Sequence, residues 1–102
     1  MCQSKTEIPQ EDTMKLKIYA VRDTAADTYG TPMFLTSTAQ AVRSFADEAN
    51  RQDDQNMIWK HPTDFELYEL GTYETDNGKI EQTETRLVTR AIDEKMIGKD
   101  KK

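Results

Sequence analysis

The stretch that decides the fold runs from Ser37 to Ala49 and reads STAQAVRSFADEA. It begins with a capping box, in which the Ser37 hydroxyl and the Gln40 amide satisfy free N–H groups at the start of a helix. Behind the cap, apolar residues recur at helical spacing and form a single stripe, which comprises Ala41, Val42, Phe45, Ala46 and Ala49. Because the stripe is mostly alanine, we expect this helix to lie close to a sheet.

Two strands are expected before the helix. Residues 15–22, KLKIYAVR, alternate well enough for a strand. Its core face is expected to carry Leu16, Ile18 and Ala20. Its other face would carry Lys15, Lys17, Tyr19 and Val21. After a polar loop over residues 23–32, the run Met33-Phe34-Leu35 predicts a second, short strand.

Two further strands are expected after the helix. Residues 50–56 are polar and predict a loop, and Pro62 marks a turn before a strand over residues 66–73. Within that strand Gly71 indicates a bulge. The triplet Asp76-Asn77-Gly78 is typical of a tight hairpin turn, and the returning strand covers residues 79–89. The predicted fold class is therefore α+β, a small antiparallel sheet with one amphipathic helix in the order β-β-α-β-β.

The 102 residues have room for one domain with a modest core. We expect a disordered leader over residues 1–13, where Ile8 is the one large aliphatic side chain. The folded domain is expected over residues 14–93. Residues 94–102 carry four lysines and predict a frayed, basic tail.

Composition argues against several classes of function. The net charge of −5 disfavours a protein that holds nucleic acid mainly through phosphate contacts. Cys2 is the only cysteine and His61 the only histidine, which excludes an internal disulfide and leaves no ligand set for a Cys/His metal site. The sequence shows no secretory signal, no membrane-spanning run, no glycine-rich phosphate loop and no activated nucleophile. We therefore predict a cytoplasmic protein that is not an enzyme and needs no metal or cofactor.

Two groups of residues are candidates for a nucleic-acid site. If the first and last strands are neighbours, Lys15, Lys17 and Tyr19 would share a basic face with Arg86 and Arg90, able to hold single-stranded DNA by stacking and phosphate contacts. The alternative is an ordinary solvated sheet face.

The second candidate is the segment from Trp59 to Phe65. Here Trp59 would stack on a base or an apolar group, while Lys60 and His61 would meet a phosphate or carboxylate. The alternative is that Trp59 and Phe65 close the end of the core.

Four blocks of the sequence resemble a known family. They are residues 14–23 (MKLKIYAVRD), 32–34 (PMF), 41–47 (AVRSFAD) and 61–71 (HPTDFELYELG). Together these blocks resemble the small nonstructural protein of gokushovirus-like microviruses (Microviridae), which are phages with circular single-stranded DNA genomes. The leader 1–13 has no counterpart in this pattern.

The resemblance implies a non-capsid accessory protein that acts in the cytoplasm of the host bacterium. Members are commonly described as DNA-binding, with a role in single-stranded genome replication and its coupling to DNA packaging. Two hypotheses follow from different classes. The chain either binds single-stranded DNA directly, or serves as an adaptor that contacts phage or host replication proteins or the procapsid. A homodimer is compatible with both, because one helix covers only one face of the sheet.

Overall fold

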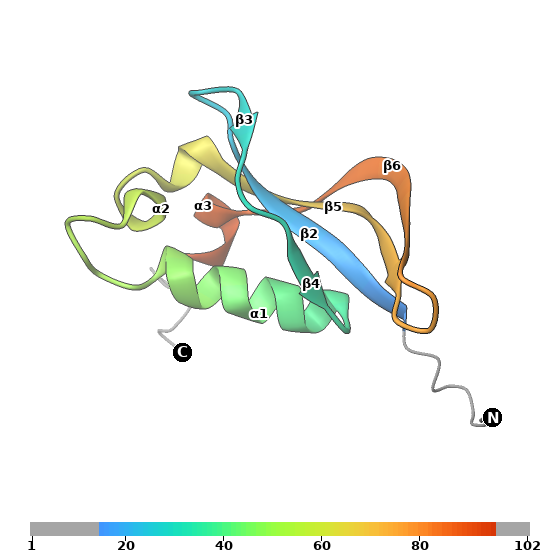
Figure 1. Cartoon of the computed structure of the whole chain (residues 1–102). Coiled ribbons are helices and arrows are strands. Elements are labelled where there is room, and N and C mark those ends of the chain that lie inside the picture. The colour runs from blue at the N-terminus through green and yellow to red at the C-terminus, as the bar shows by residue number, and fades with distance from the viewer. Residues whose placement is uncertain (1–14, 96–102) are drawn as a thin grey trace.

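An antiparallel sheet covered on one face by a helix forms the body of the molecule (Figure 1). The computed structural model describes residues 15–95. The strands are β2 (Lys15–Asp23), β3 (Thr28–Tyr29), β4 (Met33–Leu35), β5 (Phe65–Glu74) and β6 (Lys79–Arg90). The long helix is α1 (Thr38–Ala49), and the short elements are α2 (Met57–Lys60), a 3₁₀ turn (Pro62–Asp64) and α3 (Ala91–Glu94). The α+β class is confirmed, whereas the predicted order lacked β3, α2, the 3₁₀ turn and α3.

Strand β2 is the centre of the sheet. The strands follow the order β3-β2-β5-β6, and β4 pairs with β2 further along the edge that β3 occupies. All pairings are antiparallel. Because β5 lies between β2 and β6, the first and last long strands are not neighbours, and the condition set for the basic face is not met.

Helix α1 starts where its cap predicts. The Ser37 Oγ accepts a hydrogen bond from the Gln40 backbone N–H at 3.1 Å. The Gln40 side-chain oxygen reaches one residue further back than a standard capping box and accepts from the Thr36 N–H, also at 3.1 Å. Ala41, Phe45 and Ala49 are buried. The helix and its apolar stripe are thus confirmed.

The helix covers the opposite face of β2 from the one predicted. Tyr19 and Leu67 are fully buried and form the core with Ala41, Phe45 and Ala49 of α1. The Tyr19 hydroxyl lies 2.8 Å from Thr38 Oγ1, so burial of the ring leaves no polar atom unsatisfied.

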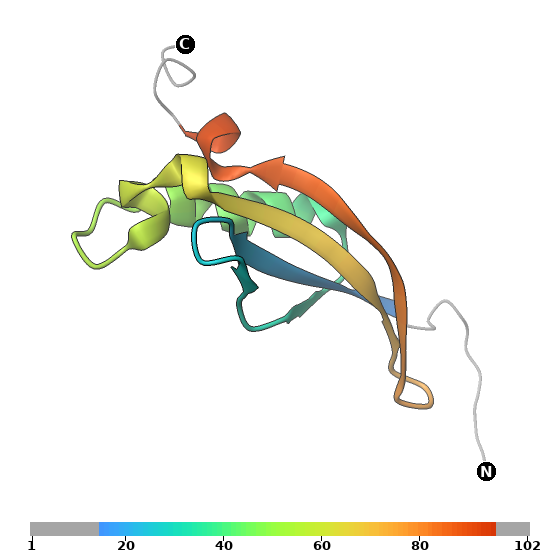
Figure 2. The ribbon, with the colours of Figure 1, turned by 90° about the horizontal axis from the view of Figure 1, so that it is seen from above.

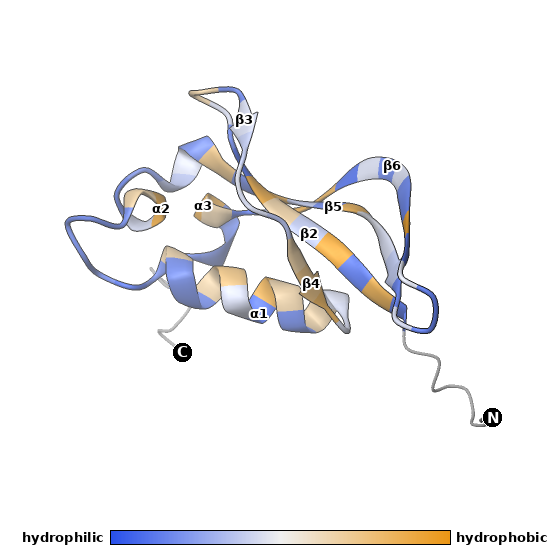
Figure 3. Cartoon of the chain, viewed as in Figure 1, coloured by the Kyte–Doolittle hydropathy of each residue, from blue (hydrophilic) through white to orange (hydrophobic). Residues whose placement is uncertain are grey.

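The predicted core face of β2 points away from the helix. Alternation along the strand places Leu16, Ile18 and Ala20 opposite Tyr19 and Val21. Ile18 and Ala20 are nevertheless buried, and their register partners on the neighbouring strands are the aromatic residues Phe34 and Tyr68. Both sets of β2 residues contain apolar side chains, as the colours along β2 show, so alternation could not decide between them (Figure 3).

The predicted bulge in β5 is confirmed. Ile18 pairs with Gly71 and Tyr19 with Glu69, so Leu70 is an extra residue in β5. On the other side Glu69 pairs with Arg86 and Gly71 with Gln82, which leaves β6 with extra residues at the same level. These irregularities accompany the strong curvature of the β5–β6 hairpin (Figure 2).

The turns and chain ends close the fold. Gly78 adopts φ +75° in the hairpin turn, as the Asn-Gly pair predicts. The buried residue after β6 is Ala91, whereas Ile92 is 39% exposed. Glu94 and Lys95 belong to the folded part, since the Lys95 ammonium donates to the carbonyl oxygens of Ala49 and Trp59. The predicted leader and residues 96–102 of the predicted tail lie outside the described residues.

Gly71→Ala should destabilise the protein strongly. A Cβ at this position would lie 2.2 Å from the Glu81 carbonyl oxygen and 3.0 Å from Gln82 Cα, both backbone atoms that cannot rotate away. We expect the free energy of unfolding to fall by about 2 kcal/mol or more, measured by urea denaturation. Gly30→Ala is the matched control, because its Cβ would meet only the Val21 carbonyl oxygen at an ordinary 3.5 Å. Equal stability of the two variants would contradict the close approach of β5 and β6.

Candidate functional site

The structure assembles the predicted basic face only in part, since Lys15, Lys17 and Arg86 lie on one side of the sheet. Tyr19 is fully buried beneath α1 and offers no ring for stacking. Arg86 lies opposite Glu69 and Arg90 opposite Glu66. Because Glu66 and Glu69 are three residues apart in a regular part of β5, the two arginines lie on opposite faces of the sheet. A register shift at Val88 places Arg86 and Arg90 on opposite faces, although strict alternation along β6 would have placed them on the same face.

Each basic residue of that predicted face is engaged with a carboxylate. The ion pairs are Lys15–Glu74 at 3.6 Å, Lys17–Glu69 at 3.9 Å, Arg86–Glu69, and Arg90–Asp93 at 3.1 Å. Glu69 is only 8% exposed, and the two cations compensate for the loss of water around it. These pairs weaken the attraction that the sheet could exert on a phosphate backbone.

Trp59 and Lys60 lie together on α2, and they differ in their contacts with the rest of the protein. The Lys95 ammonium lies 5.6 Å from the centre of the Trp59 ring and donates to the Trp59 carbonyl oxygen. The ring is half-buried, and its neighbour Lys95 is half-buried as well. Lys60 is exposed and forms no ion pair within residues 15–95. Phe65 packs against the core, as the structural alternative expected.

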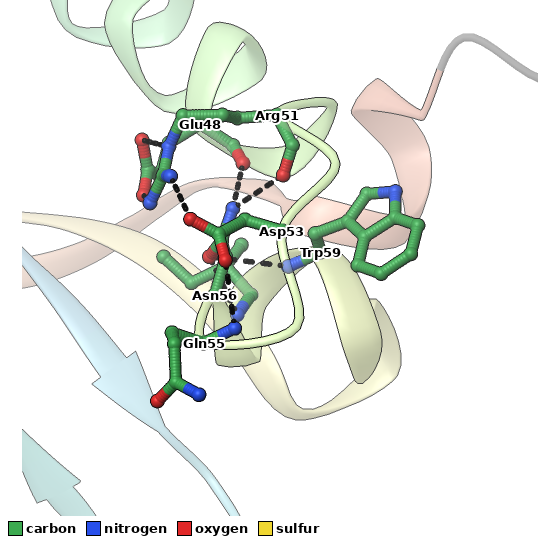
Figure 4. A network of polar contacts seen from close by, with 7 residues as sticks. Glu48, Arg51, Asp53, Gln55, Asn56 and Trp59 are labelled. Carbon is green, nitrogen blue, oxygen red and sulfur yellow. Dashed lines mark hydrogen bonds and ion pairs between the residues drawn. The ribbon is translucent and has the colours of Figure 1, made fainter.

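A buried asparagine holds α2 in place. Asn56 is 4% exposed, and its side-chain amide donates to the carbonyl oxygens of Glu48 and Arg51, both at 2.8 Å. Its side-chain oxygen accepts from the N–H groups of Ile58 and Trp59. Asn56 therefore caps α2 and ties it to the end of α1, with the Trp59 ring directed away from the network (Figure 4).

A surface ion network surrounds this cap. Arg51 donates to both carboxylate oxygens of Glu48, at 3.0 and 2.7 Å, and to Asp53 at 2.8 Å. The hydrogen bond from Arg51 lowers the pKa of Glu48 below its usual range. The pKa of Asp53 is lowered first by the backbone N–H of Gln55 and then by Arg51. The guanidinium pKa of Arg51 is raised by the same contacts.

The most prominent surface of the described residues is the sheet face away from α1. We call it the uncovered face. Four of its large apolar side chains are strongly exposed, namely Tyr29 (48%), Phe34 (43%), Ile80 (62%) and Leu87 (45%). The cross-strand register places them on one face with Ile18, Tyr68 and Tyr73, since Ile18 pairs with Phe34, Tyr68 with Leu87, and Tyr73 with Ile80. Contiguous apolar surface of this kind marks an interaction site.

Two pairs of aromatic rings stand on the uncovered face. Tyr29 and Tyr68 meet edge-to-face with ring centres 5.7 Å apart, and Phe34 and Tyr73 do so at 5.4 Å. The Arg22 guanidinium lies 5.9 Å from the centre of the Tyr29 ring. Each pair thus leaves part of a ring face or edge open to a flat ligand.

Polar groups border the Tyr29–Tyr68 pair. Arg22 forms an ion pair with Asp27 and lies 4.0 Å from Glu66. The Tyr68 hydroxyl donates to Glu66 at 2.9 Å, and this hydrogen bond, with partial burial, raises the pKa of Tyr68. On this part of the face the carboxylates of Asp27 and Glu66 thus share the single cation of Arg22.

Sequence reasoning missed the uncovered face for identifiable reasons. Tyr29 fell in a predicted loop, and Ile18, which lies under Phe34, was assigned to the core face. Tyr68 and Tyr73 differ in parity along β5, and only the bulge at Leu70 brings them to the same face. The one available signal was the apolar character of both alternating sets in residues 15–22.

The described part of the chain holds neither a cluster of metal ligands nor a membrane-crossing helix. Within residues 15–95 no three His, Cys, Asp or Glu side chains come together as a metal site. No helix in the same range is long and apolar enough to cross a membrane.

Arg51→Gln should lower stability in a pH-dependent way. Because Arg51 lowers the pKa of Glu48 and contributes to lowering that of Asp53, its stabilisation is present above their usual values of 4.5 and 3.8. That stabilisation is lost as the pH falls through the lowered values. The difference in melting temperature between the wild type and the variant should hold above about pH 5 and narrow as the pH falls below the usual pKa values of the two carboxyls. Thermal denaturation across this range measures it. Arg43→Gln, which removes an exposed cation of α1, is the control, and an equal pH dependence there would refute the assignment.

Comparison with known proteins places the chain among phage proteins. It is 27% identical over 78 residues to Protein ORF5 of Chlamydia phage 1, an alignment that covers 74% of this chain and 81% of that relative. No solved structure matches. The family model described as Phage ORF5 protein matches residues 16–94, which span nearly all the described elements. The resemblance to a small phage protein is thus confirmed, and the chain belongs to the Phage ORF5 protein family.

Proposed function

We propose that this chain is a non-enzymatic phage accessory protein that supports single-stranded DNA genome synthesis or packaging by binding single-stranded DNA on the uncovered face. One observation carries the proposal, namely that the Tyr29–Tyr68 and Phe34–Tyr73 ring pairs stand on the same exposed face. Single-stranded nucleic acid is commonly held by aromatic platforms, because every base has a face that can stack.

The spacing of the two ring pairs suits an extended strand of DNA. Tyr29 pairs with Arg22, and Phe34 pairs with Ile18 of the same strand. Four residues of β2 therefore separate the two platforms, which corresponds to about 13 Å. Bases that are not adjacent in the DNA could stack on the two platforms at once.

Charge on the uncovered face predicts a particular salt dependence. Arg22 is the cation beside the Tyr29–Tyr68 pair, and it is already paired with Asp27 and near Glu66. A plot of the logarithm of the binding constant against the logarithm of salt concentration should therefore have a slope of about −0.7. This is the value for one phosphate contact to single-stranded DNA. A steep slope would indicate a different, more basic site.

An adaptor function is the second candidate. It is favoured by the net charge of −5 and by the pairing of Lys15, Lys17, Arg86 and Arg90 with carboxylates. In this alternative the uncovered face contacts a replication protein, the procapsid or a second copy of the chain, and no DNA is bound.

Anisotropy of a fluorescent oligothymidylate tests the proposal. The Tyr29→Ala/Phe34→Ala variant should bind at least about tenfold more weakly, since base stacking contributes about 1–3 kcal/mol per base. Both side chains are strongly exposed, so the fold should tolerate the change, and thermal denaturation checks this. The control is Lys15→Gln/Lys79→Gln, two exposed lysines at the hairpin end of the sheet, on the side that α1 covers. It should change affinity less than about twofold.

Each other outcome has a definite meaning. Loss of binding only in the lysine control would move the DNA site to the predicted basic side. No binding of the wild type at low salt would overturn DNA contact and favour the adaptor. Sedimentation equilibrium then shows whether the uncovered face pairs with a second copy, since Tyr29→Ala/Phe34→Ala would make such a dimer monomeric.

A further inference from the structure

A groove lies at the end of the sheet where β2 stops. It encloses about 470 Å³ and is lined by Asp23, Ala25, Met57, His61, Asp64 and Phe65. The lining comes from three segments, which are the end of β2 with its turn, α2, and the junction of the 3₁₀ turn with β5. None of these residues belongs to the ring pairs of the uncovered face.

The groove has apolar walls. The Met57 side chain is 50% exposed, one of the most exposed large apolar residues in the described part of the chain. Phe65 also lines the groove and is held by its packing against the core. A flexible thioether beside a fixed aromatic ring is well suited to contact an aliphatic chain.

The groove also carries uncompensated negative charge. Asp23 and Asp64 form no ion pair within residues 15–95. Asp23 accepts hydrogen bonds at one carboxylate oxygen, from the backbone N–H groups of Ala25 and Ala26. The Asp64 carboxylate makes no hydrogen bond in the described part of the chain, and the nearby Arg22 is engaged with Asp27 and Glu66.

The walls of the groove are fixed to each other before any ligand arrives. The backbone N–H and the hydroxyl of Thr24 both donate to the Asp64 carbonyl oxygen, at 2.8 and 3.1 Å. On the far side the His61 N–H donates to the Met57 carbonyl oxygen at 2.8 Å. The two bonds from Thr24 join segments forty residues apart, whereas the His61 bond closes α2, so little order has to be created on binding.

We propose that this groove binds a Lys or Arg side chain presented by an exposed segment of a protein partner. The aliphatic stem would lie between Met57 and Phe65, and the cationic head would meet the carboxylates of Asp23 and Asp64. Charge complementarity selects this ligand, because a phosphate backbone would be repelled by the same two carboxylates. The site is separate from the proposed DNA surface and does not depend on it.

Peptide titration followed by NMR of the isotope-labelled full chain tests the groove. The probes are acetylated Gly-Ser-Arg-Ser-Gly amide, its lysine analogue and an uncharged norleucine analogue. The two cationic peptides should shift the amide signals of Ala25, Met57, His61 and Asp64. The norleucine peptide should bind at least about fivefold more weakly, because it lacks the cation that would hydrogen-bond to the two carboxylates.

Two variants make the test specific. Asp64→Asn should weaken binding of the arginine peptide about fivefold or more, because it removes the carboxylate that no group within residues 15–95 engages. Asp76→Asn, at an exposed aspartate of the β5–β6 turn, is the matched control and should leave the affinity unchanged. The proposal is overturned if the cationic peptides shift no groove signal, if norleucine binds equally well, or if both variants weaken binding equally.

The oligonucleotide separates this proposal from the previous one. Oligothymidylate should shift signals of Tyr29 and Phe34 and leave the groove signals unmoved. If it shifts the groove signals instead, the groove is a nucleic-acid site and the peptide proposal fails. Loss of DNA binding in Tyr29→Ala/Phe34→Ala together with intact peptide binding would show that the two sites are independent.

Discussion

The burial of Tyr19 beneath α1 is the contact on which the rest of the structure depends. The ring is fully buried, and its hydroxyl is satisfied by Thr38 Oγ1 in the first turn of the helix. This one contact joins the central strand to the start of α1 and decides which face of the sheet the helix covers. Because side chains alternate along a strand, the same choice sends Leu16, Ile18 and Ala20 to the opposite face. The aromatic surface of the molecule follows from that choice.

The bulges in β5 and β6 determine on which face of the sheet the charged side chains lie and which of them form ion pairs. At Leu70 the register shifts, which places Glu69 on the helix side, where Lys17 and Arg86 both reach it. The shift near Val88 then turns Arg90 to the other face, towards Glu66 in register and Asp93 in contact. The basic residues are consequently spread over both faces and paired with acids. In a protein organised in this way, the exposed surface of residues 15–95 is marked by aromatic and apolar side chains and not by a region of positive potential.

The two proposed surfaces suit ligands of different chemistry. The uncovered face offers rings to bases, whereas the groove at the end of β2 offers carboxylates and an apolar wall to a basic side chain. A small phage protein with both proposed surfaces could bring single-stranded DNA to a basic protein segment. Membership of the Phage ORF5 protein family agrees with an accessory role of this general kind.

The elements that depend on local contacts could be predicted from sequence alone. The capping box and alanine stripe of α1, the bulge at Gly71 and the hairpin turn at Gly78 all lie within a few residues of the signals that predict them. Four blocks of sequence were also enough to indicate the family. Tertiary structure alone decided which face of β2 is covered, that β5 separates β2 from β6, and how Tyr29, Phe34, Tyr68 and Tyr73 gather on one surface. The physical reason is that both alternating sets of β2 residues are apolar enough to be buried, and a bulge reverses every side chain beyond it, so only the packing of α1 and the register of β5 and β6 could select one arrangement.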